Sequence, residues 1–409
     1  MNLYIFKKSG KAATYGVGTY IKELTAALRG TELNICVVNL MSEKPQIQME
    51  EIAGIRYWSF PEPAQEPQMI DDQKQKTLYH RNIVYILQLL IEDKKDLVFH
   101  LNYNDCGKLS EVLRKAFDCR IIVSIHFFSW CFTLFGNVTR FRKLLELKET
   151  EQYNETIEMY RKDKDFFETA DHIICLSKNT QQILLNDYQI EPDKMDVIYN
   201  CVADSTSDKD ILMLRQKYHI PDIPIILFAG RLDKIKGLEY ALRALKTVLA
   251  SQQCHFIIAG DGNFKTYMKE CDDIWMHITW TGLIDRSKLY DLYSIADIGV
   301  MPSFHEQCSF VAIEMMMHGV PLIASTSTGL KEMVQDGVTG LHIPVIEYDD
   351  RAEIDSDLLA EKMQYLLQHP DEQQRMGASA RKLYIEKYSG EVFRKNMLQF
   401  YHSQFTHDT

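Results

Sequence analysis

The chain has 409 residues, of which 46% are hydrophobic and 25% are charged, and its formal net charge is −11 at pH 7. This length is about two or three times that of a typical domain, so we expect two domains with full hydrophobic cores. The negative balance excludes a nucleic-acid binder that acts through a broad basic face.

Cysteine usage and hydropathy predict a cytoplasmic protein whose contact with a membrane is at most peripheral. The nine cysteines form no CxxC pair, and their odd number suits a reducing compartment. The start of the chain, MNLYIFKKSGK, has only a short apolar stretch before its lysines, so we expect a first strand and no signal peptide. The longest apolar run, NIVYILQLLI (82–91), contains two amide side chains and is too short to span a bilayer.

Short apolar, β-branched runs alternate with amphipathic segments along both halves of the chain. Nearly continuous apolar strands of this kind are typical of parallel sheets covered on both faces. The first half has LYIF (3–6), NICVVNL (34–40), LVFHL (97–101), RIIVSI (120–125), HIICLS (172–177) and DVIYN (196–200). The second half has IILFAG (225–230), HFIIAG (255–260), HITWTG (277–282), DIGVMPS (297–303) and PLIAS (321–325). The alternation predicts an α/β protein of two doubly wound, Rossmann-like domains facing a central cleft.

Three segments do not belong to this regular pattern. Residues 41–73 contain PEPAQEP, which predicts a proline-rich surface excursion. Residues 137–169 are charged and helical, and we expect a solvated insertion, with an acceptor- or partner-docking element as the alternative. Residues 201–224 are polar, then helical, then broken by prolines, so they predict the linker between the domains.

One strand-to-helix turn combines glycines with two cations. IILFAGRLDKIKG (225–237) places Gly230, Arg231 and Lys236 before a helix that opens at Gly237. Glycines let the backbone approach a phosphate, a helix start supplies amide donors, and Arg and Lys supply charge. The spacing differs from that of a Walker loop. A phosphate site is one interpretation, and ordinary solvated loop cations are the other.

A second helix start lies in PSFHEQCSFVAIEMMMHGVP (302–321), between two acidic residues. Ser309 predicts the N-cap of a helix that begins at Phe310. Glu306 precedes this helix, and Glu314 lies in its second turn. Carboxylates that flank a phosphate-binding turn suit the recognition of sugar hydroxyls, with Glu314 at a ribose diol and Glu306 deeper in the cleft.

Together these motifs resemble the C-terminal half of the retaining GT-B glycosyltransferases of family 4. The resemblance is strong over about 225–344 and weaker over 3–200. It rests on RLDKIKG (231–237), AGDG (259–262), ADIGVMPSFHEQCSFVAIEMMMHGVPLIAS (296–325) and TGLKEMVQDGVTGLHIP (328–344).

The resemblance implies a role for each matching residue. In the family, the first glutamate of an E-x7-E pair faces the transferred sugar and the second binds the nucleotide ribose, and these positions are Glu306 and Glu314 here. The residues that match Arg231 and Lys236 hold the diphosphate. The donor site is then expected to comprise Gly16, Gly18, Gly230, Arg231, Lys236, Gly262, Ser309, Phe310 and Glu314.

The sequence departs from the family pattern at two places. Ser309 and Phe310 stand where the family usually has Gly-Leu, after Cys308 in place of an aromatic residue. Ser309 still offers its backbone N–H, so we expect phosphate binding to survive in a narrower sugar pocket. Thr328 replaces the first glycine of a G-G-x-x-E motif.

The N-terminal half contributes a glycine-containing turn and a histidine. YGVGTYIKEL (15–24) lacks the third glycine of a dinucleotide fingerprint, and a simple tight turn is the alternative to a site role. The resemblance implies that Gly16 and Gly18 line the donor diphosphate and the acceptor. It also implies that His126, at the end of a predicted strand, contacts the donor sugar. His100 is a weaker candidate for the same position.

The implied reaction moves a sugar from a nucleotide diphosphate to an acceptor hydroxyl and retains the anomeric configuration. A double displacement would need a carboxylate about 5 Å from an acid partner, and no such nucleophile is identified. The leaving phosphate is therefore expected to take the acceptor proton, while His126 orients a sugar hydroxyl and supports developing charge. Arg231, Lys236 and helix amides stabilise the leaving group, so no cofactor or metal is expected. A UDP-sugar is favoured over a GDP- or ADP-sugar.

The expected domains are an acceptor-side domain of residues 1–200 and a donor-binding domain of residues 201–386. In GT-B enzymes the last helix, here about 387–409, crosses back to the first domain, although its apolar stripe could equally cover its own domain. The stripe comprises Phe393, Met397, Phe400 and Tyr401.

The expected partners are a nucleotide-sugar donor and a glycan, lipid-linked glycan or peptide acceptor, in bacterial glycan or glycoconjugate biosynthesis. Nucleic acid is not an expected partner. The rival functions are a GT-B nucleotide-sugar epimerase or phosphorylase, and a non-catalytic acceptor-binding subunit. The sequence leaves open the donor, the acceptor, the linkage, the oligomeric state and the role of residues 137–169.

Overall fold

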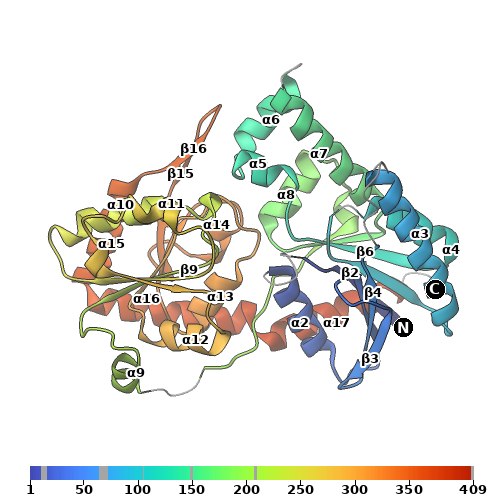
Figure 1. Cartoon of the computed structure of the whole chain (residues 1–409), viewed down its shortest axis with the longest axis horizontal. Helices are drawn as coiled ribbons and strands as arrows, with labels where there is room; N and C mark the ends of the chain where they lie inside the picture. Colours follow the sequence, from blue (N-terminus) through green and yellow to red (C-terminus); the bar gives the residue numbers. More distant parts are fainter. Residues whose placement is uncertain (11–15, 64–71, 105, 148–150, 207–209, 407–409) are drawn as a thin grey trace. The chain divides into compact units, whose positions relative to one another are not determined.

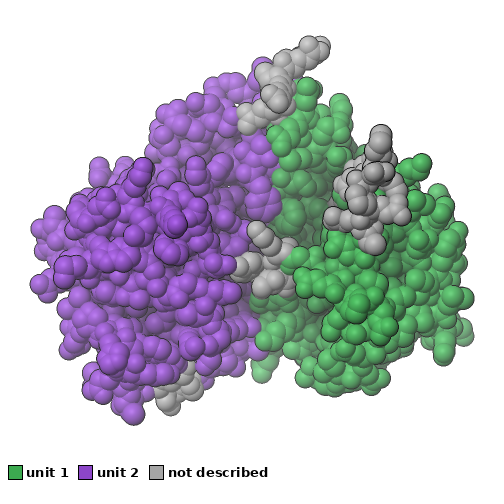
Figure 2. Space-filling model, viewed as in Figure 1, with its two compact units in different colours: residues 1–129, 148–199, 390–409 green, residues 130–147, 200–389 purple. Residues whose placement is uncertain are grey.

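The computed structural model describes all residues except 11–15, 64–71, 105, 148–150, 207–209 and 407–409. The chain forms two compact units (Figure 2). Unit 1 comprises residues 1–129, 148–199 and 390–409, and unit 2 comprises residues 130–147 and 200–389. Residues 130–147 thus come from the first half of the sequence and group with unit 2.

Unit 1 is built on an eight-stranded sheet in the order β3-β4-β2-β1-β5-β6-β7-β8. Every neighbouring pair is parallel except β3 and β4. The strands are β1 (Asn2–Lys8), β2 (Asn34–Ser42), β3 (Gln48–Ile52), β4 (Ile55–Pro61), β5 (Leu97–Leu101), β6 (Cys119–Ile125), β7 (His172–Cys175) and β8 (Met195–Val197). The helices are α2 (Gly16–Leu28), α3 (Asp72–Leu90), α4 (Gly107–Ala116), α7 (Glu151–Glu168), α8 (Lys178–Asn186) and α17 (Gly390–Thr406).

Unit 2 is built on a six-stranded parallel sheet in the order β11-β10-β9-β12-β13-β14, with a separate hairpin of β15 and β16. Its strands are β9 (Ile225–Ala229), β10 (His255–Ala259), β11 (Ile278–Gly282), β12 (Ile298–Met301), β13 (Leu322–Ser325), β14 (Gly340–Ile343), β15 (Val345–Glu347) and β16 (Ala352–Ile354). Its helices are α5 (Trp130–Leu134), α6 (Val138–Glu146), α9 (Ile211–Lys217), α10 (Leu238–Leu249), α11 (Lys265–Met268), α12 (Arg286–Ile295), α13 (Phe310–Met317), α14 (Leu330–Met333), α15 (Ser356–Gln368) and α16 (Pro370–Leu383).

Both sheets confirm the predicted doubly wound architecture. In each unit the first strand lies inside the sheet, and the strand order reverses beside it, between β1 and β5 in unit 1 and between β9 and β12 in unit 2. Open α/β sheets bind ligands outside the carboxyl ends of their strands at such a switch point. The fold therefore marks one candidate position for a ligand in each unit.

The prediction of a surface excursion at 41–73 is wrong for its first part. Residues 48–61 form an antiparallel hairpin, and its second strand, β4, extends the parallel sheet beside β2. Ile55, Trp58 and Phe60 of β4 are buried, and Ala53 and Gly54 turn the hairpin with positive φ. The prolines follow this hairpin, and residues 64–71 lie outside the described residues.

The expected insertion at 137–169 is two separate elements. Asn137 caps α6 and donates its side-chain N–H to Tyr348 O (2.9 Å) and Arg351 O (3.0 Å), which attaches α6 to the β15–β16 hairpin of unit 2. Helix α7 belongs to unit 1 and buries Asp163 and Phe166. A solvated insertion is therefore the wrong description of α7, because its inner face is part of the core.

Helix α17 packs in unit 1 beside α2 (Figure 1). All four residues of the predicted apolar stripe are buried, and Phe393 makes an edge contact with Tyr20 of α2. The hydroxyl of Tyr401 is 2.7 Å from His100 Nδ1. The alternative in which this stripe packs against the second, donor-binding domain is therefore excluded. Among the described helices, none has the length and apolar character needed to cross a membrane.

Candidate active site

The turn after β9 is held in place by its neighbours at the switch point of unit 2. The Gly230 amide donates to Ala259 O (2.9 Å), and Leu232 pairs with Gly262 through a bridge. Gly237 has φ +67, and a Cβ on it would lie 2.0 Å from Pro302 O, so only glycine allows this approach to the end of β12. Of the predicted donor residues, Gly230 and Gly262 thus fix the turn on which the cations stand.

This close packing brings Lys236 to Glu306, the two residues predicted to act at the diphosphate and the sugar. Lys236 Nζ is 2.5 Å from Glu306 Oε1, and their side chains are 20% and 13% exposed. A pair this sheltered is a charge-assisted hydrogen bond and is screened less than a surface pair. Arg231 is more exposed and pairs with Asp233 (3.0 Å). Both predicted phosphate ligands therefore already stand beside a carboxylate.

The backbone of Glu306 is fixed from the other side by Thr328 and Gly329. The Glu306 amide donates to Thr328 Oγ1 (2.9 Å), and the Gly329 amide donates to Glu306 O (2.7 Å). A Cβ on Gly329 would lie 1.8 Å from Gln307 O, so the second glycine of the motif is required by contact. Thr328, which the sequence comparison treats as a departure, thus supplies a hydroxyl that holds the candidate catalytic loop.

Ser309 caps α13 as predicted, with its hydroxyl oxygen accepting from the Ala312 amide (3.4 Å). Its own amide donates to Met333 Sδ (3.3 Å). The Ser309 N–H is therefore directed at a thioether sulfur, which is a weak acceptor, and its expected role at a phosphate stays a prediction. Phe310 is half-buried at the first position of the helix.

Glu314 is buried, and both of its carboxylate oxygens are engaged within unit 2. Oε1 accepts from Arg286 Nε (3.1 Å) and Tyr290 Oη (3.3 Å), and Oε2 accepts from Tyr293 Oη (3.1 Å). Burial raises the pKa of Glu314, and the charge of Arg286 opposes this effect.

These three partners of Glu314 were not predicted from the sequence. Their spacing along α12, at i, i+4 and i+7, puts Arg286, Tyr290 and Tyr293 on one helix face, and this is the signal that could have shown them.

His305, the residue before Glu306, is a second feature that the sequence did not reveal. It is buried, and among the described residues neither of its ring nitrogens has a hydrogen-bond partner. Burial and the nearby charge of Lys236 lower its pKa to about 3. A neutral imidazole with unused hydrogen-bonding capacity therefore lies directly beside the Lys236–Glu306 pair.

In unit 1, His126 follows β6 and is half-buried against Tyr20, with ring centroids 4.8 Å apart. Its Nε2 is 3.2 Å from Asn102 Oδ1, and Asn102 Nδ2 donates to His100 O, which orients the amide. The carbonyl oxygen can only accept, so Nε2 carries the proton and Nδ1 is an acceptor. Burial lowers the pKa of His126 to about 3, so the neutral ring can orient a hydroxyl but supplies no charge at pH 7.

The weaker candidate, His100, is a structural residue. It is fully buried, and its two ring nitrogens lie 2.7 Å from Tyr401 Oη and 2.7 Å from Ser124 Oγ. Gly16 and Gly18 lie in the first turn of α2, and Gly16 is exposed. Tyr20 lies one turn beyond Gly16 and contacts His126, so the start of α2 and the end of β6 are neighbours.

The segment that follows His126 is anchored by Asp163 of α7. The carboxylate accepts from Ser129 N (2.7 Å), Ser129 Oγ (2.7 Å) and Asn104 Nδ2 (3.1 Å). Burial raises the pKa of Asp163 to about 6, although these hydrogen bonds favour the charged form. Asp163 thus positions the connection between β6 and α5 and was not identified from the sequence.

Two family models match adjoining parts of the chain. The model described as Glycosyltransferase Family 4 matches residues 14–205, and the model described as Glycosyl transferases group 1 matches residues 211–383. The chain belongs to the group 1 glycosyltransferases. The sequence-based resemblance to this family is thereby confirmed at the level of the family.

The chain spans about half the length of the curated relatives that it matches. Alpha-D-kanosaminyltransferase of Streptomyces kanamyceticus is 25% identical over 225 residues, which cover 53% of this chain and 56% of the relative. D-inositol 3-phosphate glycosyltransferase of Corynebacterium aurimucosum is 25% identical over 278 residues, which cover 64% of this chain and 63% of the relative.

Solved structures share the fold over nearly the whole chain. Sucrose-phosphate synthase from Thermosynechococcus elongatus superposes with a TM-score of 0.79 at 21% identity and covers all of both chains. Anabaena Alr3699/HepE in complex with UDP and glucose superposes with a TM-score of 0.72 at 15% identity, over 98% of this chain and 100% of that one. The fold is therefore GT-B.

Asp163 makes the stability of the glycosyltransferase depend on pH. Its folded pKa of about 6 exceeds the unfolded value of about 3.9, so the folded state keeps a proton that the unfolded state releases. The free energy of unfolding should therefore fall as pH rises from about 4 to about 6, by on the order of 2 kcal/mol. Urea unfolding of the wild type and of Asp163→Asn at several pH values measures this, because the variant lacks the titrating group. Parallel curves for the two proteins would contradict the assignment.

Arg286 should stabilise the fold through Glu314. Arg286→Met leaves a buried carboxylate without its cation and should lower the free energy of unfolding by about 2–3 kcal/mol. Arg286→Met combined with Glu314→Gln should recover at least about 1 kcal/mol of that loss, because no charge then remains uncompensated. Urea unfolding measures the three variants of the cycle, which are Arg286→Met, Glu314→Gln and the double variant.

The matched control for this cycle is Lys288→Met, which removes an exposed cation from the same helix. It should change stability by less than about 0.5 kcal/mol. Strictly additive effects of the Arg286 and Glu314 substitutions would show that the two side chains do not interact.

Proposed function

We propose that the protein transfers a sugar from a nucleotide diphosphate donor to an acceptor hydroxyl, with retention of configuration and without a metal ion. The observation that carries this proposal is the sheltered contact between Lys236 and Glu306 at the switch point of unit 2. A cation for a phosphate and a carboxylate for a sugar hydroxyl stand there within one hydrogen bond of each other. Because the chain belongs to a glycosyltransferase family, we assign the cation to the donor phosphate and the carboxylate to the donor sugar.

The chemistry demands a group that stabilises the leaving diphosphate. As the bond between the anomeric carbon and the diphosphate oxygen breaks, negative charge grows on the phosphate and positive charge grows on the sugar ring. Lys236 and Arg231 stabilise the negative charge on the phosphate, and the Glu306 carboxylate stabilises the positive charge on the sugar ring. The acceptor oxygen bonds to the anomeric carbon on the same face, and its proton passes to the departing phosphate oxygen. All atoms are accounted for without an added nucleophile.

Glu314 and His126 bind and orient in this scheme. Oε2 of Glu314 accepts one hydrogen bond from Tyr293 and keeps a lone pair for a ribose hydroxyl, while the charge of Arg286 opposes the effect of burial and favours the charged form of the carboxylate. His126 accepts a sugar hydroxyl at Nδ1. The donor is taken to be a UDP-sugar, which the UDP and glucose bound in the Anabaena structure support. The acceptor belongs to glycan or glycoconjugate biosynthesis.

The carboxylate and the lysine of the central pair should each be essential for turnover. Glu306→Ala and Lys236→Ala should each reduce turnover by at least about 100-fold, because each removes a preorganised charge from the reacting atoms. Lys234→Ala, in the same turn but exposed, is the matched control and should keep wild-type turnover. The donor is first identified by thermal shift with a panel of nucleotide sugars, since a bound donor stabilises the fold.

The readout is release of the nucleoside diphosphate that depends on an acceptor, with circular dichroism as the check on folding. Acceptor-dependent release also separates a transferase from an epimerase or a phosphorylase. Near-normal turnover in both Glu306→Ala and Lys236→Ala would show that the site lies elsewhere.

A further inference from the structure

Residues 130–147 fold into unit 2, whereas the residues before and after them in the sequence belong to unit 1. We call this segment the strap. It consists of α5, a turn at residues 135–137 and α6, and the ring of Trp130 stacks on the ring of Phe141 with a centroid distance of 4.1 Å. Both aromatic side chains are buried, so the strap has a small packed core of its own.

The turn of the strap is attached to the β15–β16 hairpin. The side-chain amide of Asn137 donates to Tyr348 O (2.9 Å) and Arg351 O (3.0 Å). The carboxylate of Glu347 accepts from the backbone amide of Thr139 (3.1 Å), at the start of α6. Asn137 is buried, so its hydrogen bonds are sheltered from water. The hairpin therefore fixes the turn of the strap within unit 2.

The same turn presses on residues 304–306, the candidate catalytic loop. Gly136 is buried with φ +68, and a Cβ on it would lie 2.8 Å from Phe304 O and 2.9 Å from His305 Cβ. These distances are too short for a side chain, so glycine is what allows the strap to come this close. Phe304 and His305 directly precede Glu306 in the chain. The strap thus contacts the loop at the two residues next to the candidate catalytic carboxylate.

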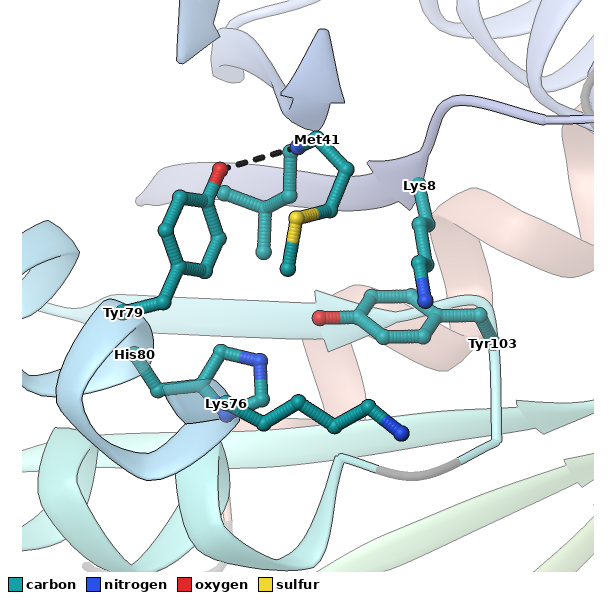
Figure 3. A pocket seen from close by; sticks show the side chains of 7 residues that line it. Lys8, Met41, Lys76, Tyr79, His80 and Tyr103 are labelled. Carbon is teal, nitrogen blue, oxygen red and sulfur yellow. Dashed lines mark hydrogen bonds between the residues drawn. The ribbon is translucent and has the colours of Figure 1, made fainter. Parts of the chain in front are cut away.

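The residue before Gly136 has a strained backbone. Phe135 has φ +52, in the left-handed region that bulky residues rarely adopt. Met41 of unit 1 has the same φ, and there the Met41 amide donates to Tyr79 Oη (2.8 Å), which helps to hold the backbone (Figure 3). The ring of Phe135 makes an edge contact with Phe304 at a centroid distance of 6.1 Å. Strained residues that their surroundings hold in place cluster at functional sites, and this one lies against the catalytic loop.

The loop is also bonded to the cationic turn that carries Lys236. The Phe304 amide donates to Ile235 O (2.8 Å), and the Glu306 amide donates to Thr328 Oγ1 (2.9 Å). Because Ile235 directly precedes Lys236, a shift of the loop would change the position of the Glu306 carboxylate relative to Lys236. A misplacement of about 1 Å at reacting groups can cost about 100-fold in rate.

We propose that the strap positions Glu306 for sugar transfer, with Gly136 as the positioning residue. The inference rests on the proposed function, in which the Glu306 carboxylate stabilises positive charge on the transferred sugar. Gly136 acts on this carboxylate through the backbone of Phe304 and His305. Its replacement should therefore slow transfer and spare the affinity for the donor diphosphate, which the cationic turn binds.

The test substitution is Gly136→Ala, because the added Cβ would displace the loop. Gly30→Ala is the matched control, since Gly30 also has a left-handed φ (+71) and a Cβ there would meet no atom of the described residues within 4 Å. A second variant, Asn137→Ser, keeps a capping oxygen at the start of α6 and removes the amide donors to the hairpin. Urea unfolding checks that each variant folds.

Two readouts are compared among these proteins. Hydrogen exchange of the Phe304 and Glu306 amides reports on the loop, and steady-state kinetics with the donor identified by thermal shift report on transfer. Gly136→Ala should raise both exchange rates and lower kcat by at least about tenfold, while the donor KM and the affinity for UDP change by less than about twofold. Asn137→Ser should change exchange and kcat in the same direction by at least about threefold, and Gly30→Ala should match the wild type.

Wild-type exchange or wild-type kcat in Gly136→Ala would overturn the proposal, and so would an equal loss of kcat in Gly30→Ala. If Gly136→Ala does not fold, Asn137→Ser decides by the same two readouts. A purely structural role would lower stability without separating kcat from KM. Failure of the proposed function would appear as a wild type without transfer, and the exchange rates would still show whether the strap holds the loop, so the two failures are distinguishable.

Discussion

The ion pair between Lys236 and Glu306 is the interaction on which the account of this protein depends. Lys236 Nζ lies 2.5 Å from Glu306 Oε1, and both side chains are little exposed. If either side chain moved away, the other would remain as a sheltered charge without a partner, which would destabilise the fold. The fold prevents this by fixing both backbones through glycines that no other residue could replace. Gly237 presses against the end of β12, and Gly329 presses against the residue after Glu306. The chemistry of the site is therefore a consequence of close backbone packing at a sheet edge.

Three other ionisable side chains of the two units also lie beside partners that limit their motion. Arg231 has Asp233, Glu314 has Arg286, and Asp163 gathers the amide and hydroxyl of Ser129. Groups held in this way need little reorganisation when charge develops in a transition state, which is the source of most electrostatic catalysis. A donor that binds here has to replace or add to these existing contacts, with its diphosphate at Arg231 and its ribose at Glu314.

Much of the fold was predictable from the sequence, because buried parallel strands and helix caps leave local patterns. Most strands of the two sheets, the Ser309 cap and the cationic turn at Arg231 are all local features, whereas β3, β4 and β14 were not predicted. The features that were missed depend on contacts between distant residues. The engagement of both Glu314 oxygens requires α12 to lie beside α13, and the division of residues 137–169 depends on where Asn137 and Asp163 find partners. The hairpin of β3 and β4 was hidden by its half-exposed, polar alternation and by the prolines that follow it.

The most direct test is a crystal structure of the protein with an intact nucleotide sugar. The account predicts the pyrophosphate between Arg231 and Lys236, the ribose at Glu314 and the sugar ring at Glu306. A donor bound at any other position, or a pyrophosphate in contact with neither Arg231 nor Lys236, would contradict it.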